Sequence, residues 1–220
     1  MPFDPDEDRG IPPKGRDEWI TYALFLGTMG LCFVLALVEE FEPKKLSLIF
    51  FCLAHVAFTF VHEASHALAA WLLDWHVEEI VVGSGKPIAS FKAGSIPVRV
   101  CLLPLSGYVR TFPNDLVRPR LKSAAIYFAG PGSSLVIVAA IALLVGPDVL
   151  LSASNNLGLI GLQSVALAGI VNAIPNLMPL PATLDGRNVP NDGLGIIQSF
   201  LASESAFALR QDAHWGKRDR

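Results

Sequence analysis

The chain has 220 residues, enough for one domain of ordinary size, and 52% of them are hydrophobic while only 17% are charged. A mean hydropathy of +0.46 excludes an ordinary soluble domain and indicates a membrane protein. The net charge is -3 and no basic face interleaved with aromatic residues occurs, which excludes nucleic acid as a partner.

The chain begins with a polar segment and continues into apolar ones. Residues 1–18 are acidic and rich in proline, and they lack the basic start and cleavage site of a secretory signal. We expect a disordered cytoplasmic tail here, followed by a single membrane-embedded domain over residues 19–206. Four apolar stretches can cross a bilayer as helices, at about 1.5 Å per residue. These stretches are residues 19–38, 46–73, 123–145 and 157–177.

Residues 76–111, between the second and third stretches, have a different composition. Short runs rich in Val and Ile are separated by Gly and Pro, which is typical of strands joined by turns. We therefore expect an α-helical polytopic membrane protein with a small membrane-associated β-sheet. A loop rich in Pro, Asn and Asp follows the last span. It leads to a short helix over residues 193–208 and a C-terminal tail over residues 209–220.

The positive charges predict the orientation of the chain. All 17 Lys and Arg lie outside the window from Ser123 to Gly186. Because Lys and Arg are enriched in cytoplasmic loops, the sheet region and both termini should face the cytoplasm. We expect a multi-pass protein of a prokaryotic plasma membrane.

The second apolar stretch contains His62, Glu63 and His66 in the pattern HExxH. Residues four apart lie on one helix face, so both imidazoles can bind one metal ion, and zinc accepts nitrogen and oxygen ligands. Glu63 can take a proton from a water molecule. An ionisable residue near the centre of a span costs ~2.5–3.5 kcal/mol, and zinc can contribute on the order of 10 kcal/mol. A polar face lining a helix contact or a water cavity is the competing interpretation.

A zinc site of this kind needs a third protein ligand at a similar depth. Asp185 and Asp192 both follow the last span, and each is followed by Gly. Either carboxylate could supply the ligand, so both are candidates.

In chain order, the segments HEASH, PLSGYVRT, AGPGSS and NLMPLPATLDG or NDG resemble the intramembrane zinc metalloproteases of the site-2 protease type. The resemblance implies a compact form without a PDZ or CBS domain. It implies one zinc ion per chain, bound by His62, His66 and an aspartate before Gly. It also implies that Glu63 is the general base and that Asn176 donates to the oxyanion of the substrate.

The chain departs from the family pattern at the aspartate. Pro190 lies shortly after Asp185 and argues against an immediate helix there. Asp192 begins the apolar segment DGLGIIQSFL, and capping would hold an aspartate at the start of such a helix. We prefer Asp192 as the third ligand and keep Asp185 as the alternative.

The expected function is a zinc endopeptidase that hydrolyses a peptide bond of membrane-spanning substrates. The substrate would pair as an extended strand with an edge of the sheet. The other expected partners are the lipid bilayer and a regulatory membrane protein. Two alternatives stay open: a catalytically silent membrane chaperone of the same fold, against which Glu63 argues, and a metal-ion transporter, against which the lack of inverted repeats argues.

Overall fold

The computed structural model describes residues 27–28, 30–31, 34–35, 38–39, 42–184 and 187–215. The expected tail, residues 1–18, and most of the expected first span, residues 19–38, lie outside the described residues. The prediction of four spans therefore stays a prediction.

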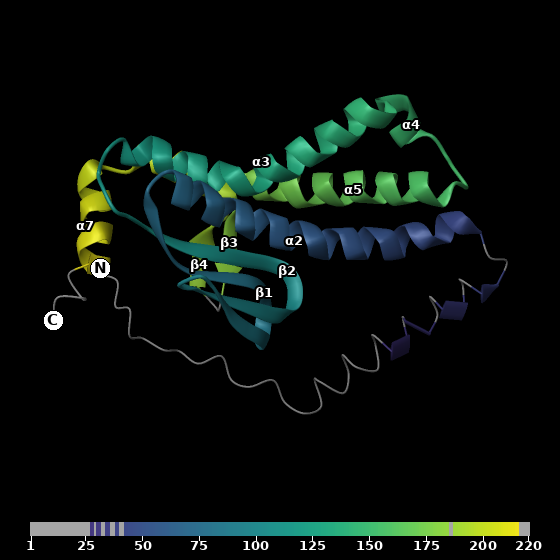
Figure 1. Ribbon diagram of the computed structural model, residues 1–220, viewed down its shortest axis with the longest axis horizontal. Helices are drawn as coiled ribbons and strands as arrows, with labels where there is room; N and C mark the ends of the chain where they lie inside the picture. The colour runs from purple at the N-terminus through teal and green to yellow at the C-terminus, as the bar shows by residue number, and fades with distance from the viewer. Residues whose placement is uncertain are drawn as a thin grey trace.

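Three of the described helices are long and apolar enough to cross a membrane. The first runs over Pro43–Leu72 and consists of a 3-10 turn, η1 (Pro43–Leu46), and helix α2 (Ser47–Leu72). The other two are α3 (Pro119–Val145) and α5 (Leu157–Leu177). All three pack against one another and run lengthwise side by side (Figure 1). The described chain is thus mostly helical.

Small residues bring α2, α3 and α5 close together. A Cβ atom at Gly169 of α5 would lie 2.6 Å from a methyl group of Val138 and 2.8 Å from the ring of Phe58. Ala54 and Ala168 complete this contact with Phe58 in a buried apolar cluster. Small residues at helix interfaces are how helices pack closely within a membrane, where lipid removes the hydrophobic driving force.

Helix α3 begins four residues before the expected third span and ends where that span was expected to end, at Val145. It begins at Pro119, where a proline is favoured because its missing N–H has no helical partner to lose. A short helix, α4 (Pro147–Leu151), follows it directly. Helix α3 bends near its middle (Figure 1), and Pro131 lies in the middle of its residue range. A proline inside a helix removes one backbone hydrogen bond and commonly causes such a bend.

The sheet consists of two long antiparallel strands, β1 (Trp75–Ala93) and β2 (Ile96–Pro113), in place of several short ones. Bulges interrupt their register. Residues 80–82 of β1 pair with residues 107–109 of β2 and also with residues 98–100. Residues 80–82 of β1 are therefore paired on both sides, and residues 107–113 of β2 pair only with β1 in the part of the chain that the structure describes.

The end of the chain forms a small hairpin and two helices. Strands β3 (Pro181–Leu184) and β4 (Arg187–Pro190) pair antiparallel where a loop was expected. Helix α6 (Asp192–Leu201) and helix α7 (Glu204–Trp215) replace the single helix expected over residues 193–208.

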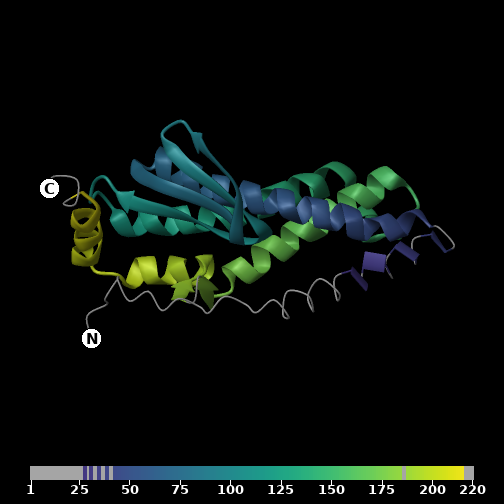
Figure 2. The ribbon, with the colours of Figure 1, turned by 90° about the horizontal axis from the view of Figure 1, so that it is seen from below.

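The break between α6 and α7 has a local cause. Ala202 has an extended backbone, and the Ser203 hydroxyl accepts a 3.3 Å hydrogen bond from the backbone N–H of Ala206, which caps α7. Helix α7 runs across the end of the bundle and includes residues 209–215, which were expected to be tail (Figure 1). Its Phe207 packs against Trp75 of β1. Figure 2 shows the sheet and α6 on opposite sides of this end of the bundle.

Candidate metal centre

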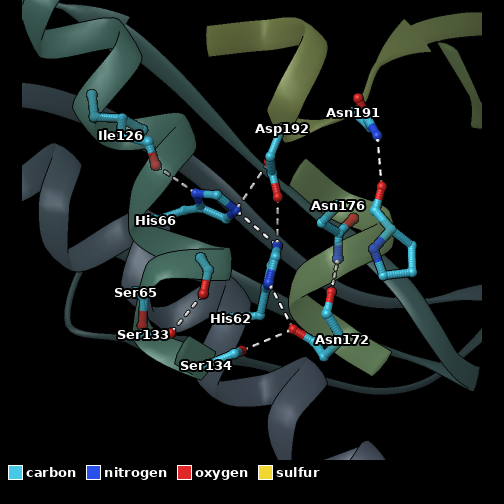
Figure 3. Close-up of polar contacts among 12 residues, drawn as sticks. His62, Ser65, His66, Ile126, Ser133, Ser134, Asn172, Asn176, Asn191 and Asp192 are labelled. Atoms are coloured by element: carbon cyan, nitrogen blue, oxygen red, sulfur yellow. Dashed lines mark hydrogen bonds and ion pairs between the residues drawn. The ribbon is translucent and has the colours of Figure 1, made fainter. Parts of the chain in front are cut away.

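Three side chains from distant parts of the chain converge inside the bundle. His62 and His66 lie one turn apart on α2, and Asp192 is the first residue of α6 (Figure 3). The Nε2 atoms of the two imidazoles are 3.0 Å apart. The Asp192 carboxylate oxygens lie 2.9 Å from Nε2 of His62 and 3.3 Å from Nε2 of His66. Both histidines are buried.

The hydrogen bonds of the other ring nitrogens determine which tautomers are present. Nδ1 of His66 lies 2.6 Å from the backbone oxygen of Ile126, and Nδ1 of His62 lies 3.1 Å from Oδ1 of Asn172. A carbonyl oxygen can only accept, so both Nδ1 atoms carry the proton in the neutral rings. The two Nε2 atoms are then bare, with their lone pairs facing each other.

This arrangement fits a bound metal ion. Two lone pairs at 3.0 Å beside a carboxylate repel unless a proton or a metal cation lies between them. Tetrahedral zinc with ligands at ~2.0–2.2 Å sets neighbouring ligand atoms roughly 3.3 Å apart, close to the separations seen here. His62, His66 and Asp192 are the one group of three or more potential ligands found among the described residues.

The Asp192 carboxyl is in the ionised form that a metal requires. In the metal-free protein burial raises its pKa, but hydrogen bonds from the His62 and His66 rings in their protonated form, and the positive charge of those rings, outweigh burial and lower the pKa to about 2. At neutral pH the group therefore carries its negative charge.

Glu63 is buried beside the three converging side chains. Within the described part of the chain, its Oε2 atom has no hydrogen-bond partner. A buried carboxylate oxygen is costly to leave unpaired, so a water molecule or a substrate group is the natural partner. Strand β2 passes directly over Glu63 at Gly107, where a Cβ atom would lie 2.6 Å from Oε1 of Glu63.

Gly130, in the AGPGSS segment, lies directly against the imidazoles of His62 and His66. A Cβ atom at Gly130 would lie 2.6 Å from Nε2 of His62 and closer still to Nε2 of His66. Helix α3 therefore presents bare backbone to the space between the imidazoles, and any larger residue would fill that space.

Asn172 of α5 was not expected to take part in the site. Its buried Oδ1 accepts from the Ser134 hydroxyl at 3.0 Å and from the imidazole of His62 at 3.1 Å (Figure 3). A partner of this kind fixes the ring orientation of a metal-binding histidine and its tautomer. The repeated Asn-x-x-Pro spacing at Asn172 and Asn176 was the signal in the sequence, but the spacing does not say which asparagine faces the histidine.

We expect Asn172→Ala to weaken zinc binding by about 10- to 100-fold, because the His62 ring loses the acceptor that orients it. Competition with a chromophoric chelator measures this affinity. Gln163→Ala on the same helix is a suitable control, since the Gln163 side chain binds the backbone oxygens of Val149 and Ser152, near the start of α5. Equal affinities for the two variants would contradict the role given to Asn172.

The remaining expected site residues are placed differently. The side-chain amide of Asn176 donates to the backbone oxygen of Asn172 at 2.8 Å, and its contact with a substrate stays a prediction. Asp185, the alternative third ligand, lies outside the described residues. Of the two candidate aspartates, Asp192 is the one that the structure describes, and its carboxylate lies against both histidines.

Three apolar helices around a cluster of two buried imidazoles and a partly buried carboxylate define a membrane protein with a site of the metallopeptidase type. Residues 50–158, about half of the chain, match Peptidase family M50, the family of the site-2 proteases. The chain belongs to this family, and the resemblance inferred from its motifs is confirmed.

One curated relative is a candidate zinc metalloprotease of Chlamydia trachomatis serovar D. It is 37% identical over 68 residues, which make up 30% of this chain but 11% of the relative's length. Family membership supports a protease and, at the level of the family, a zinc enzyme.

Proposed function

We propose that the chain is a zinc endopeptidase that hydrolyses a peptide bond of membrane-spanning proteins within or near the bilayer. The observation that carries this proposal is the cluster of His62, His66 and Asp192 beside Glu63, whose Oε2 atom has no partner in the described chain. Both histidines and Glu63 lie on a helix able to cross a membrane. Ionisable groups at such a depth are expensive and are usually functional.

The residues of the site support separate roles in metal binding, proton transfer and stabilisation of the oxyanion. His62, His66 and Asp192 would hold the ion. Zinc bound there would polarise the scissile carbonyl and lower the pKa of a water molecule. Glu63 accepts a proton from the attacking water and returns it to the leaving amine. The Asn176 amide has a second N–H beyond the one bonded to Asn172, and this N–H could donate to the carbonyl oxygen as negative charge develops.

The sheet supports a way of presenting the substrate. A peptide bond in a helix is shielded by the hydrogen bonds of that helix, so cleavage needs an extended segment. The hydroxyl of Thr59 donates to the backbone oxygen of Pro104 at 3.0 Å, and Gly107 lies against Glu63, so this part of β2 follows the site face of α2. A substrate strand added along the outer edge of β2 would lie beside the catalytic groups.

The charges support a cytoplasmic position for this end of the bundle. Glu63 lies about 14 Å along α2 from its end at Leu72, and the sheet that follows α2 contains Lys86, Lys92, Arg99 and Arg110. The site would therefore open toward the cytoplasm, in a plasma membrane, with both termini on the same side. A regulatory membrane partner remains part of the proposal.

Metal removal tests the proposed function. We expect 1,10-phenanthroline to abolish cleavage of a single-span test substrate in proteoliposomes, and added zinc to restore it, because the Asn176 amide alone would neither polarise the carbonyl strongly nor lower the pKa of the attacking water. The isomer 1,7-phenanthroline, whose nitrogens cannot chelate one ion, is the control and should leave cleavage unchanged. Undiminished cleavage by protein that atomic emission shows to be free of metal would contradict the proposal.

A further inference from the structure

The start of α6 is tied to the end of α5 by the side chain of one residue, Asn191. Its Oδ1 atom accepts from the backbone N–H of Leu194 at 3.1 Å and from that of Leu180 at 3.2 Å. Its Nδ2 group donates to the backbone oxygens of Pro175 at 3.1 Å and Met178 at 2.5 Å. The single amide therefore bonds to both helices at once. Figure 3 shows Asn191 with one of these bonds, the one that its nitrogen makes to a proline backbone oxygen.

The two halves of this amide satisfy different backbone groups. The oxygen caps α6, whose first N–H groups have no partner within the helix. The nitrogen takes up carbonyls at the end of α5, where Pro175 interrupts the helix and the last turn has free oxygens. Few other side chains could do both, because an asparagine amide has acceptor and donor groups in one plane.

The same junction is closed by direct backbone contact. A Cβ atom at Gly193 would lie 2.5 Å from the backbone carbon of Leu177, so the beginning of α6 rests on the last residue of α5. Asp192 lies in the chain between Asn191 and Gly193. Its position relative to α5, and to the imidazole that Asn172 of α5 orients, is therefore fixed on both sides.

We propose that Asn191 is a positioning residue for the metal ligand Asp192, acting through the donor half of its amide, which holds α6 to the end of α5. This inference rests on the proposed function, since it requires a metal at His62, His66 and Asp192. A carboxylate that arrives from a separate helix must be held in place, because small displacements of a ligand lower the affinity for the ion. The motif Asn-Asp-Gly is then a unit in which the neighbours of the ligand set its position.

Two substitutions distinguish the donor bonds of Asn191, which hold α6 to α5, from the helix cap that its oxygen provides. Asn191→Ala removes both halves of the amide. Asn191→Ser keeps a residue that is favoured at a helix N-cap but loses the amide donors to Pro175 and Met178. The matched control is Asn156→Ala. Asn156 caps the start of α5 in the same way: its Oδ1 atom accepts from the backbone N–H of Leu159 at 3.1 Å. The start of α5 is the end opposite to the one that Asn191 contacts.

Affinity for zinc, and for cobalt followed by its visible absorption, is measured on the purified full chain together with the thermal stability of the metal-free protein. We expect both Asn191 variants to bind about 10- to 100-fold more weakly than the wild type and to show an altered cobalt spectrum. Asn191→Ser, which keeps a capping side chain, should lose no more stability in the metal-free state than Asn156→Ala. Asn156→Ala should lose stability but keep its metal affinity.

Asn191→Ser with the wild-type affinity and cobalt spectrum would overturn the inference while leaving the proposed function intact. Equal loss of affinity in Asn156→Ala would also overturn it, because the effect would then follow general stability. A wild-type chain that binds no metal would overturn the proposed function, and the inference with it.

Discussion

Glu63→Gln is expected to lower the rate of peptide-bond cleavage by at least about 10²- to 10⁴-fold while the zinc content stays unchanged. The amide has nearly the same shape as the carboxylate but cannot accept a proton from water. Because Glu63 is buried with Oε2 unpaired in the described chain, the substitution also removes a costly negative charge, so the variant should fold. Cleavage of a single-span substrate in proteoliposomes and zinc analysis of the same preparation measure the two quantities.

The control is Glu204→Gln, an exposed glutamate in the first turn of α7. Cleavage by this variant should equal that of the wild type. Full activity in Glu63→Gln would refute the assignment of the general base. Wild-type protein that binds zinc and cleaves nothing would favour the silent chaperone, and zinc flux into liposomes without proteolysis would favour a transporter.

Gly130→Ala is the second substitution with a large expected effect. Its methyl group would occupy the space next to Nε2 of both His62 and His66, where backbone alone now lies. We expect the variant to lose the bound zinc and, with it, all cleavage. Helix α3 should persist, since alanine favours a helix over glycine by roughly 1 kcal/mol. Zinc content and circular dichroism distinguish loss of the ion from loss of the fold.

Gly161→Ala is the matched control for this substitution. Gly161 is also within a membrane-spanning helix, α5, and a Cβ atom there would have no atom within 4 Å. The control should keep its zinc and its activity. A Gly130→Ala protein with one zinc ion and wild-type cleavage would show that α3 does not approach the imidazoles as the structure has it.

Local sequence patterns were sufficient to predict which three side chains the structure brings together, while their roles stay predictions. His62 and His66 are four apart on one helix, so their shared face needs no knowledge of the rest of the fold. The preference for Asp192 over Asp185 rested on where a helix could begin, and α6 does begin at Asp192. The start of a helix can be predicted because it depends on a few neighbouring residues.

Contacts between elements could not be predicted in the same way. Asn172 faces His62 from 110 residues away, and Gly130 approaches the same ring from α3. Neither choice is visible in a single sequence, because it depends on how α2, α3 and α5 are rotated against one another. The bulged pairing of β1 and β2 and the break between α6 and α7 depend likewise on contacts outside each segment.

The metal centre itself is tested most directly by zinc X-ray absorption spectroscopy on the purified wild-type chain, combined with metal analysis. We expect one zinc ion per chain with two imidazole nitrogens, oxygen as the remaining ligand type and no sulfur, and a loss of zinc in Asp192→Ala. Substoichiometric zinc, sulfur ligation by Cys52 or Cys101, or an unchanged spectrum in Asp192→Ala would contradict a centre built from His62, His66 and Asp192.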